Sequence, residues 1–245
     1  MSCDEEATQI TANQDCKLTE QLITYPSNLI YKTTLKHSDD GKEIEGTSFN
    51  NASGVWDTIN YIMSLDDIGR IIKNCAQPCL GYYSEFIYNT EQLIQVNQYN
   101  NNILWERWDL EYNLNKQVVK TKKYYTNEGA LFLASYLDLQ YSNVDSKNPI
   151  STTSYDVNGK IVLKREFKYD NKKISFYGSY ILSDNYGVNN PIQIIYSNTN
   201  GITQTINNTY EYNDKDYPVS YSSIVTYSNG TSYGPIVAKY SYDCK

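Results

Sequence analysis

Histidine is almost missing from this chain: His37 is the only one among 245 residues. Because imidazole is the usual general base near neutral pH, its scarcity argues against the common forms of acid–base and triad catalysis. Ser38 and Asp39 follow it directly, but a triad requires groups that converge in space. The segment 39–41 is instead typical of a hairpin turn. We therefore expect a protein that is not an enzyme.

Positive charge and long apolar runs are also scarce. The 21 lysines and arginines are outnumbered by 28 aspartates and glutamates, which gives a net charge of -7 and a pI near 4.8. Such a chain lacks the basic field that a phosphate backbone requires, so we expect no nucleic-acid binding. No apolar run approaches the ~20 residues of a membrane-spanning helix.

The sequence also contains little that would indicate a metal site or a cofactor. The sequence has no glycine-rich loop that would hold a phosphate group. The acidic turns 39–43 and 213–216 lack the alternating ligands of a calcium loop. We expect neither a metal site nor a cofactor.

Tyrosine, in contrast, is abundant, with 26 residues against 5 phenylalanines and 3 tryptophans. Many of the tyrosines belong to one repeated phrase: an aromatic residue or leucine, any residue, tyrosine, then asparagine or aspartate. The phrase occurs at residues 86–89, 110–113, 167–170, 210–213 and 240–243. In a strand the first and third positions share one face, and the last residue begins a turn. The repeat therefore predicts a β-meander.

Other patterns extend this prediction to the whole chain. Two stretches that begin at Asn148 and Asn190 align with each other, and each contains an Asn-Gly pair, at 158–159 and 200–201, that is typical of a type I′ hairpin turn. Apolar and polar residues alternate in segments such as 217–227. We predict a mainly β fold, an antiparallel β-meander that forms a large curved sheet or partial barrel.

Two segments depart from the alternation and predict helix. Between 55 and 75 the apolar residues recur at helical spacing, and Ser64-Leu65-Asp66-Asp67 resembles a capping box, so we predict one or two short helices there. The short apolar segment 130–134 also slightly favours helix.

The amino terminus suggests where the protein resides. Cys3 follows a small residue and precedes acidic residues and a polar stretch, which is typical of the mature start of a bacterial lipoprotein whose signal peptide has been removed. Cys3 would then carry the lipid, residues 1–20 would form the anchor and flexible tether, and residues 21–245 a single β-rich domain. The alternative is an ordinary start with an incidental cysteine.

The other four cysteines, Cys16, Cys75, Cys79 and Cys244, allow three pairings. Cys75 and Cys79 are close enough in sequence for a small disulfide loop, and Cys16 would then join Cys244 across the two ends of the domain. Zinc is the alternative for the first pair, but no histidine is near and a second close cysteine pair is missing. We expect disulfides, which are typical of exported proteins.

The acidic start at Cys3, the richness in asparagine and tyrosine, and the repeated phrase resemble uncharacterised cell-envelope lipoproteins of the Bacteroidetes type. Members of that group resemble tyrosine-rich β-meanders with porin-like or half-barrel domains. The resemblance covers residues 82–245 together with Cys3. It implies export, lipid anchoring to the bacterial outer membrane on its periplasmic or surface face, and no catalytic residues.

One segment indicates a ligand site. If residues 104–112 form a strand, Trp105, Arg107 and Asp109 share its polar face, opposite Trp108 and Leu110. An indole beside a charged pair is suited to stack on a sugar ring and bond its hydroxyls. The alternative is a cross-strand salt bridge beside a partly covered indole.

The function that these features favour is a non-catalytic envelope lipoprotein that binds an extracellular ligand such as a glycan. The alternatives are a structural or assembly subunit that engages another envelope protein, and a half-barrel carrier of an apolar ligand. In each case contact with a membrane would come only through the lipid on Cys3.

Overall fold

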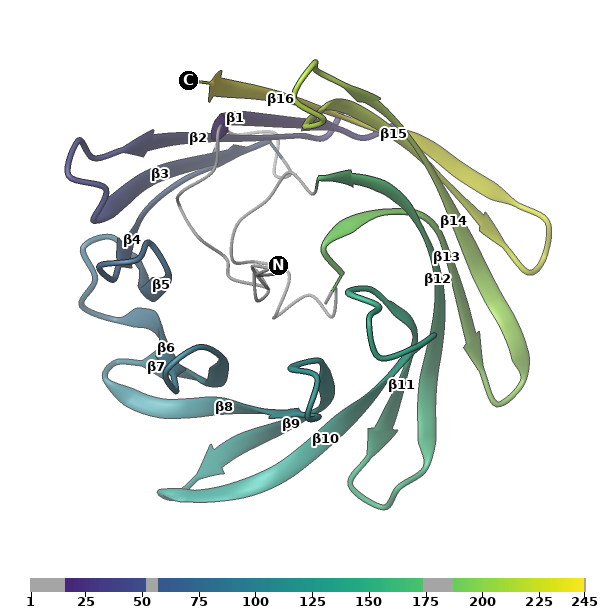
Figure 1. The fold of residues 1–245 in the computed structure, drawn as a ribbon, viewed down its shortest axis with the longest axis horizontal. Helices are drawn as coiled ribbons and strands as arrows, with labels where there is room; N and C mark the ends of the chain where they lie inside the picture. Colours follow the sequence, from purple (N-terminus) through teal and green to yellow (C-terminus); the bar gives the residue numbers. More distant parts are fainter. Residues whose placement is uncertain (1–15, 52–56, 174–186, 245) are drawn as a thin grey trace, which may run out of the picture.

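The computed structural model describes residues 16–51, 57–173 and 187–244, and these residues form sixteen strands. The strands are β1 (Cys16–Thr24), β2 (Ile30–His37), β3 (Glu43–Asn50), β4 (Asp57–Leu65), β5 (Ile71–Ala76), β6 (Tyr82–Tyr88), β7 (Leu93–Asn100), β8 (Ile103–Tyr112), β9 (Val118–Asn127), β10 (Ala130–Tyr141), β11 (Pro149–Asp156), β12 (Ile161–Lys173), β13 (Asn189–Asn198), β14 (Gly201–Tyr212), β15 (Pro218–Tyr227) and β16 (Ser232–Cys244). Each strand pairs antiparallel with its sequence neighbours (Figure 1). The predicted mainly β meander is confirmed.

The sheet closes completely, where the sequence predicts only a curved sheet or partial barrel. β1 pairs with β16 from Cys16 opposite Cys244 to Thr24 opposite Val237, which joins the first strand to the last. Closure removes the two free edges that an open meander would expose. The domain also begins earlier than predicted, because residues 16–20, assigned to the tether, belong to β1.

The helices predicted near residues 55–75 are absent from the described part of that segment, which forms β4 and β5. Apolar residues at helical spacing were misleading here because both faces of β4 carry them: Met63 is buried opposite Ile44, whereas its neighbour Ile62 lies on the other face, opposite Glu45. The predicted capping box is a turn in which the Asp66 carboxylate accepts hydrogen bonds from the backbone N–H groups of Ile68 and Arg70. Segment 130–134 likewise lies in β10 rather than a helix.

Each strand presents one face to the barrel interior and one to the outside. Residues opposite each other in neighbouring strands share a face, so the registers carry the inward set around the whole barrel. The inward set includes most of the buried apolar residues, which form one cluster. Its members are Leu18, Leu35, Ile44, Met63, Leu65, Ile71, Phe86, Leu93, Val96, Leu110, Ala238 and Tyr240.

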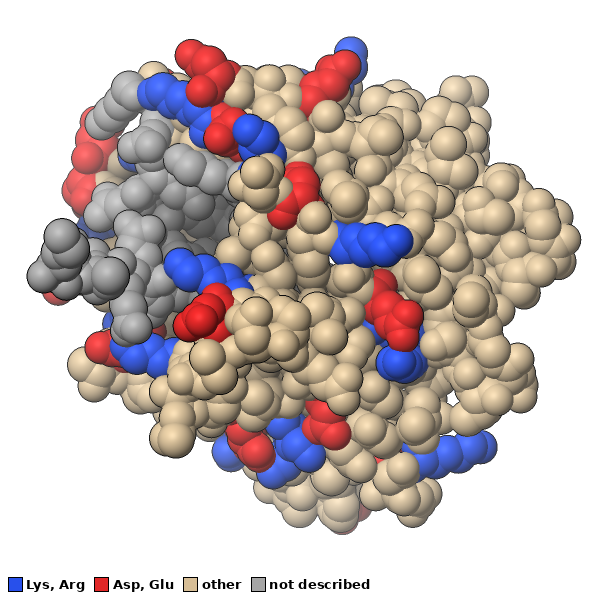
Figure 2. All heavy atoms as spheres, turned by 45° about the vertical axis from the view of Figure 1, so that its right-hand side comes forward, with Lys and Arg blue, Asp and Glu red and all other residues tan. Residues whose placement is uncertain are grey.

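The outward face carries ion pairs between neighbouring strands. Lys32 contacts Glu20 at 2.9 Å between β2 and β1, and Lys122 contacts Glu111 at 2.5 Å between β9 and β8. Figure 2 shows basic and acidic side chains beside one another over the visible face, without a large patch of either sign. The described residues include no helix that is long and apolar enough to cross a membrane.

The repeated tyrosine phrase has a structural role at the ends of the strands. The hydroxyl of Tyr88 donates to the carbonyl of Ile71 at 3.0 Å, and that of Tyr112 donates to the carbonyl of Leu93 at 2.8 Å. Tyr242 makes the same kind of bond to Pro218, at 2.9 Å. Each of these tyrosines, near the end of one strand, thus binds the beginning of the strand before it.

The asparagine that ends the phrase closes the following turn. The side-chain oxygen of Asn113 accepts hydrogen bonds from the backbone N–H groups of Asn115 and Gln117, at 2.9 and 3.0 Å. Asn213 does the same two and four residues ahead. The phrase therefore ends a strand and begins a turn, as its spacing predicts.

The Asn-Gly pairs form a different turn from the one predicted. A type I′ turn needs positive φ at both central residues. At 158–159 and 200–201 only the glycine has positive φ, 77° and 111° respectively, whereas Asn101 and Asn102, and likewise Glu128 and Gly129, have it at both positions.

Because several tyrosines are buried, the free energy of unfolding depends on pH in the alkaline range. Burial raises the pKa of Tyr88 and of Tyr141 to about 12, and it also raises the pKa of Tyr112. Between about pH 10 and about pH 12 the folded protein therefore keeps protons that the unfolded chain releases, so the free energy of unfolding falls as pH rises through this window. Below about pH 10 these groups contribute no pH dependence.

Urea unfolding from pH 8 upward measures this effect, and we expect the midpoint to decrease once the pH exceeds about 10. A variant with Tyr88→Phe and Tyr141→Phe should show a weaker decrease, because phenylalanine does not ionise. A midpoint that stays constant to about pH 12 would contradict the prediction.

The structure contains two disulfides, at the four positions proposed from the sequence. Cys16 is bonded to Cys244, which links β1 to β16 across 228 positions of sequence. Cys75 is bonded to Cys79 around the turn between β5 and β6.

The two ends of the barrel differ in their turns. At the terminal end, where β1 begins and β16 ends, lie the turns that follow the even-numbered strands; at the far end lie those that follow the odd-numbered strands. Figure 1 shows the far-end hairpins β9–β10, β11–β12, β13–β14 and β15–β16 splaying outward from the barrel.

Candidate functional site

The three residues predicted to form one site lie on opposite faces of β8. The register between β7 and β8 shifts after Gln98, so that Gln98 faces Glu106 while Tyr99 faces Leu104, and Trp105 is the extra residue. Such a bulge interrupts the alternation of side chains along the strand. The prediction of a shared face for Trp105, Arg107 and Asp109 is wrong for this reason.

Arg107 and Asp109 belong to the outer wall. The Arg107 Nε donates to an Asp109 oxygen at 2.6 Å, and its guanidinium lies 5.9 Å from the ring of Tyr124. The hydrogen bond to Asp109 raises the pKa of Arg107. The two residues form a salt bridge within β8 itself, so the cross-strand bridge beside the indole that the alternative interpretation described is not the one observed.

Trp105 lies on the inward face. Its indole stacks with Tyr125 of β9, which is directly opposite Glu106, and the ring centroids are 6.2 Å apart. Tyr82 of β6 lies 6.2 Å away on the other side. Tyr82 and Tyr125 are 46% and 44% exposed, so the row remains accessible. We call Tyr82, Trp105 and Tyr125 the aromatic row.

The indole nitrogen of Trp105 adds a polar group to this row. It is buried and has no hydrogen-bond partner among the described residues. A buried N–H without an acceptor carries a free-energy cost, which a bound oxygen atom would remove.

A buried ion pair adjoins the aromatic row. Lys123 Nζ lies 2.8 Å from Glu106 Oε2, and the two side chains are only 22% and 5% exposed. The indole N–H of Trp108 donates to the other oxygen of Glu106. The Lys123 ammonium also lies 4.9 Å from the ring of Tyr125 and 4.8 Å from that of Trp108.

These contacts keep Lys123 charged. Burial alone lowers its pKa, but hydrogen bonds from the ammonium to Glu106 and Tyr125 outweigh burial, and the pKa is raised. The pair thus places a fixed cation on an inward surface where Trp105, Trp108 and Tyr125 supply aromatic rings.

A cavity of about 230 Å³ lies beside Lys123 on the inner wall of β8 to β11. Besides Lys123, its lining includes Trp108, Leu137 and the hydroxyl residues Thr121, Ser135 and Ser154. This volume is below the roughly 300–1,000 Å³ of sites that enclose drug-sized ligands. The cavity therefore suits one small polar group of a larger molecule that extends along the aromatic row.

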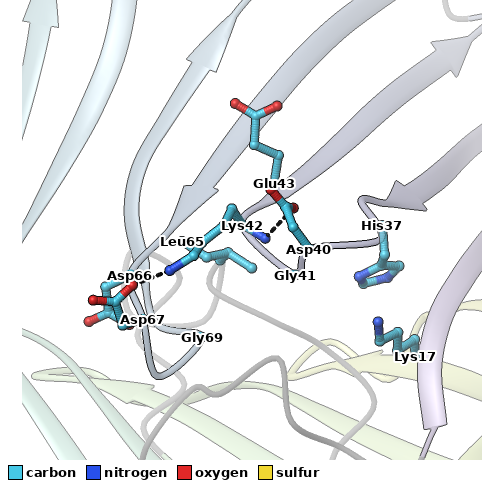
Figure 3. Close-up of a pocket in the computed structure, with 10 residues that line it drawn as sticks. All are labelled: Lys17, His37, Asp40, Gly41, Lys42, Glu43, Leu65, Asp66, Asp67 and Gly69. Carbon is cyan, nitrogen blue, oxygen red and sulfur yellow. Dashed lines mark hydrogen bonds and ion pairs between the residues drawn. The ribbon is translucent and has the colours of Figure 1, made fainter.

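A second, smaller cavity of about 130 Å³ lies at the terminal end (Figure 3). Several of its charged residues are engaged with neighbours: Lys42 forms an ion pair with Asp67, and Asp40 accepts hydrogen bonds from Ser38 and the Lys42 backbone. We assign it to solvated turns.

His37 lines the same cavity, and its Nε2 lies 3.0 Å from the carbonyl oxygen of Leu18. Burial lowers the pKa of His37, against a smaller opposing effect of that carbonyl. Because the ring is engaged with the backbone of β1, this contact gives His37 a role in packing.

Searches of family models and of curated proteins found no match for this chain. Among solved structures, a porin-like protein from Bacteroides uniformis is similar, with a TM-score of 0.63 and 12% sequence identity over 91% of this chain and 96% of that one. The two proteins share a fold. A porin-like protein from Bacteroides vulgatus is a weaker likeness, with a TM-score of 0.41 and 13% identity over 92% of this chain and 98% of that one.

Sequence reasoning found Trp105 but missed the residues that surround it. Tyr82, Glu106, Lys123 and Tyr125 come from three strands, and only the registers show that they meet. Glu106 did carry a signal: it is a charged residue whose alternation in β8 places it with Trp108 on the face predicted to be buried.

Proposed function

We propose that the protein is a non-catalytic, ligand-binding protein of a bacterial cell envelope, and that it holds a glycan on its aromatic row. The observation that carries this proposal is the partnerless indole N–H of Trp105 between two exposed tyrosine rings. Aromatic rings stack against the C–H faces of sugars, and nearby polar groups bond the hydroxyls.

The neighbouring cavity supports the same class of ligand. Lys123 and the hydroxyls of Thr121, Ser135 and Ser154 line it. Because Glu106 balances the charge of Lys123, the site is suited to a neutral, hydroxyl-rich group. A sugar would stack on Trp105 and direct a hydroxyl toward Lys123.

Three features support an envelope location. The start at Cys3 is typical of a bacterial lipoprotein, two disulfides are typical of an oxidising compartment, and the shared fold belongs to a porin-like protein of a Bacteroides species. On this proposal the lipid on Cys3 anchors the protein to the outer membrane.

The outer wall of the barrel supports the proposal that the barrel lies in water and is attached to the membrane without spanning it. Membrane-spanning barrels present an outward apolar band about 25 Å tall. Here the outward face carries the pairs Lys32–Glu20, Lys122–Glu111 and Lys164–Glu166. A wall with these charges belongs in water, so the shared fold does not by itself bring the activity of a pore.

Affinity electrophoresis against a panel of neutral polysaccharides tests the proposal, with Cys3→Ser protein so that no lipid is attached. We expect retardation of the parent protein and at least about tenfold weaker binding by Trp105→Ala, which corresponds to roughly 1.4 kcal/mol. Circular dichroism would establish that the variant remains folded.

Arg107→Ala is the matched control, because Arg107 is two residues away in β8 but on the outer wall. It should bind as tightly as the parent. If Trp105→Ala also binds normally, the aromatic row is not the site. If the parent protein is retarded by none of the polysaccharides, the glycan proposal fails.

A further inference from the structure

Large apolar side chains are exposed at the far end of the barrel. They lie in or beside the turns of five successive far-end hairpins, from β5–β6 to β13–β14. We call this set the apolar rim: Leu80 (74% exposed), Ile103 (68%), Leu131 (40%), Phe132 (55%), Val157 (52%) and Ile202 (59%). Because Figure 1 shows the last three of these hairpins splayed apart, their tips form separate projections around the mouth of the barrel.

The far end is also nearly free of charge. Its described turns contain only Glu128 and Lys160 as charged residues. The described turns at the terminal end contain thirteen, namely Asp39, Asp40, Lys42, Asp66, Asp67, Arg70, Glu91, Lys116, Asp145, Lys147, Asp214, Lys215 and Asp216. The two ends of one barrel therefore suit different surroundings, the terminal end water and the far end an apolar phase.

Two tyrosines lie slightly deeper than the rim, and a third is level with it. Tyr82 is two residues beyond Leu80 and Tyr155 is two residues before Val157, whereas Tyr125 is directly opposite the rim residue Phe132. Apolar tips backed by tyrosines match the order of a bilayer interface, where aromatic rings lie at the level of the headgroups and aliphatic groups reach the acyl boundary.

We infer that the apolar rim inserts shallowly into the surface of a lipid bilayer. A protein partner would usually require a continuous, complementary patch, whereas separate apolar tips without charge need only a soft apolar phase. This contact shares Tyr82 and Tyr125 with the aromatic row but requires no bound glycan, and it adds to any lipid on Cys3.

Flotation with phosphatidylcholine vesicles tests the inference, again with Cys3→Ser protein so that only the rim can bind. We expect the parent protein to float with the vesicles. The triple variant Leu80→Ser, Ile103→Ser, Phe132→Ser should partition at least about tenfold less. Binding should change little between about 0.1 and 0.5 M salt, because the rim lacks charge.

The matched control removes three exposed apolar side chains from the terminal end: Ile68→Ser, Leu114→Ser and Val144→Ser. This variant should float like the parent. Equal flotation of the far-end variant and the parent would overturn the inference, as would a parent that stays in solution. A parent that instead forms dimers which the far-end variant abolishes would identify a second copy, rather than a membrane, as the occupant of the rim.

Discussion

Replacing both Cys16 and Cys244 by serine is expected to lower the free energy of unfolding by roughly 5 kcal/mol. The disulfide closes a loop of 228 positions, and a cross-link restricts the unfolded chain more strongly as the enclosed loop grows. It also fixes the pairing between β1 and β16, on which closure of the barrel depends. Urea unfolding at neutral pH measures the loss.

The second disulfide provides the control. Cys75 and Cys79 are four positions apart, so replacing both by serine should cost only roughly 2 kcal/mol. Circular dichroism should show a β-sheet spectrum for both variants before denaturant is added. Equal losses for the two variants would mean that the long loop is already restricted in the unfolded chain.

Glu106→Ala is expected to lower the free energy of unfolding by about 3 kcal/mol, because it leaves the charge of Lys123 on the inner wall without its partner. The substitution also removes the acceptor for the indole N–H of Trp108. The cation–π contacts of Lys123 with Trp108 and Tyr125 remain, and they prevent a larger loss. Thermal and urea unfolding give the measurement.

Glu111→Ala is the comparison, since Glu111 forms an ion pair with Lys122 of the same two strands on the outer wall, where both side chains are more exposed. Exposed pairs contribute little, so this variant should lose less than about 1 kcal/mol. If Glu106→Ala and Glu111→Ala lower the free energy of unfolding equally, water must screen the ion pair on the inner wall as it screens the pair on the outer wall.

The strands could be predicted from sequence because their signals are local. The phrase at 110–113 contains both the tyrosine that binds the preceding strand and the asparagine that closes the turn. The helices near 55–75 were predicted wrongly because that signal was ambiguous: strands with apolar residues on both faces imitate helical spacing over one or two turns. Closure itself was not predicted, although the expected disulfide between Cys16 and Cys244 already placed the beginning of β1 beside the end of β16.

The candidate site was partly predictable. Trp105 was found because tryptophan beside charged residues in a strand is an unusual pattern. Its true neighbours were missed because one bulge after Gln98 reverses the face on which Trp105 lies. Strand register decides such contacts, and the sequence of one strand does not contain it.

Closure by the first and last strands determines when the barrel can be completed. Fifteen of the sixteen strand pairings join neighbours in sequence, so a chain emerging from its amino terminus can form them one after another. The β1–β16 pairing must wait until the last residues have appeared, and until then β1 has a bare edge on which another chain can add. Completion is therefore a late event that follows synthesis of all sixteen strands, and a truncated chain without β16 should remain prone to aggregation.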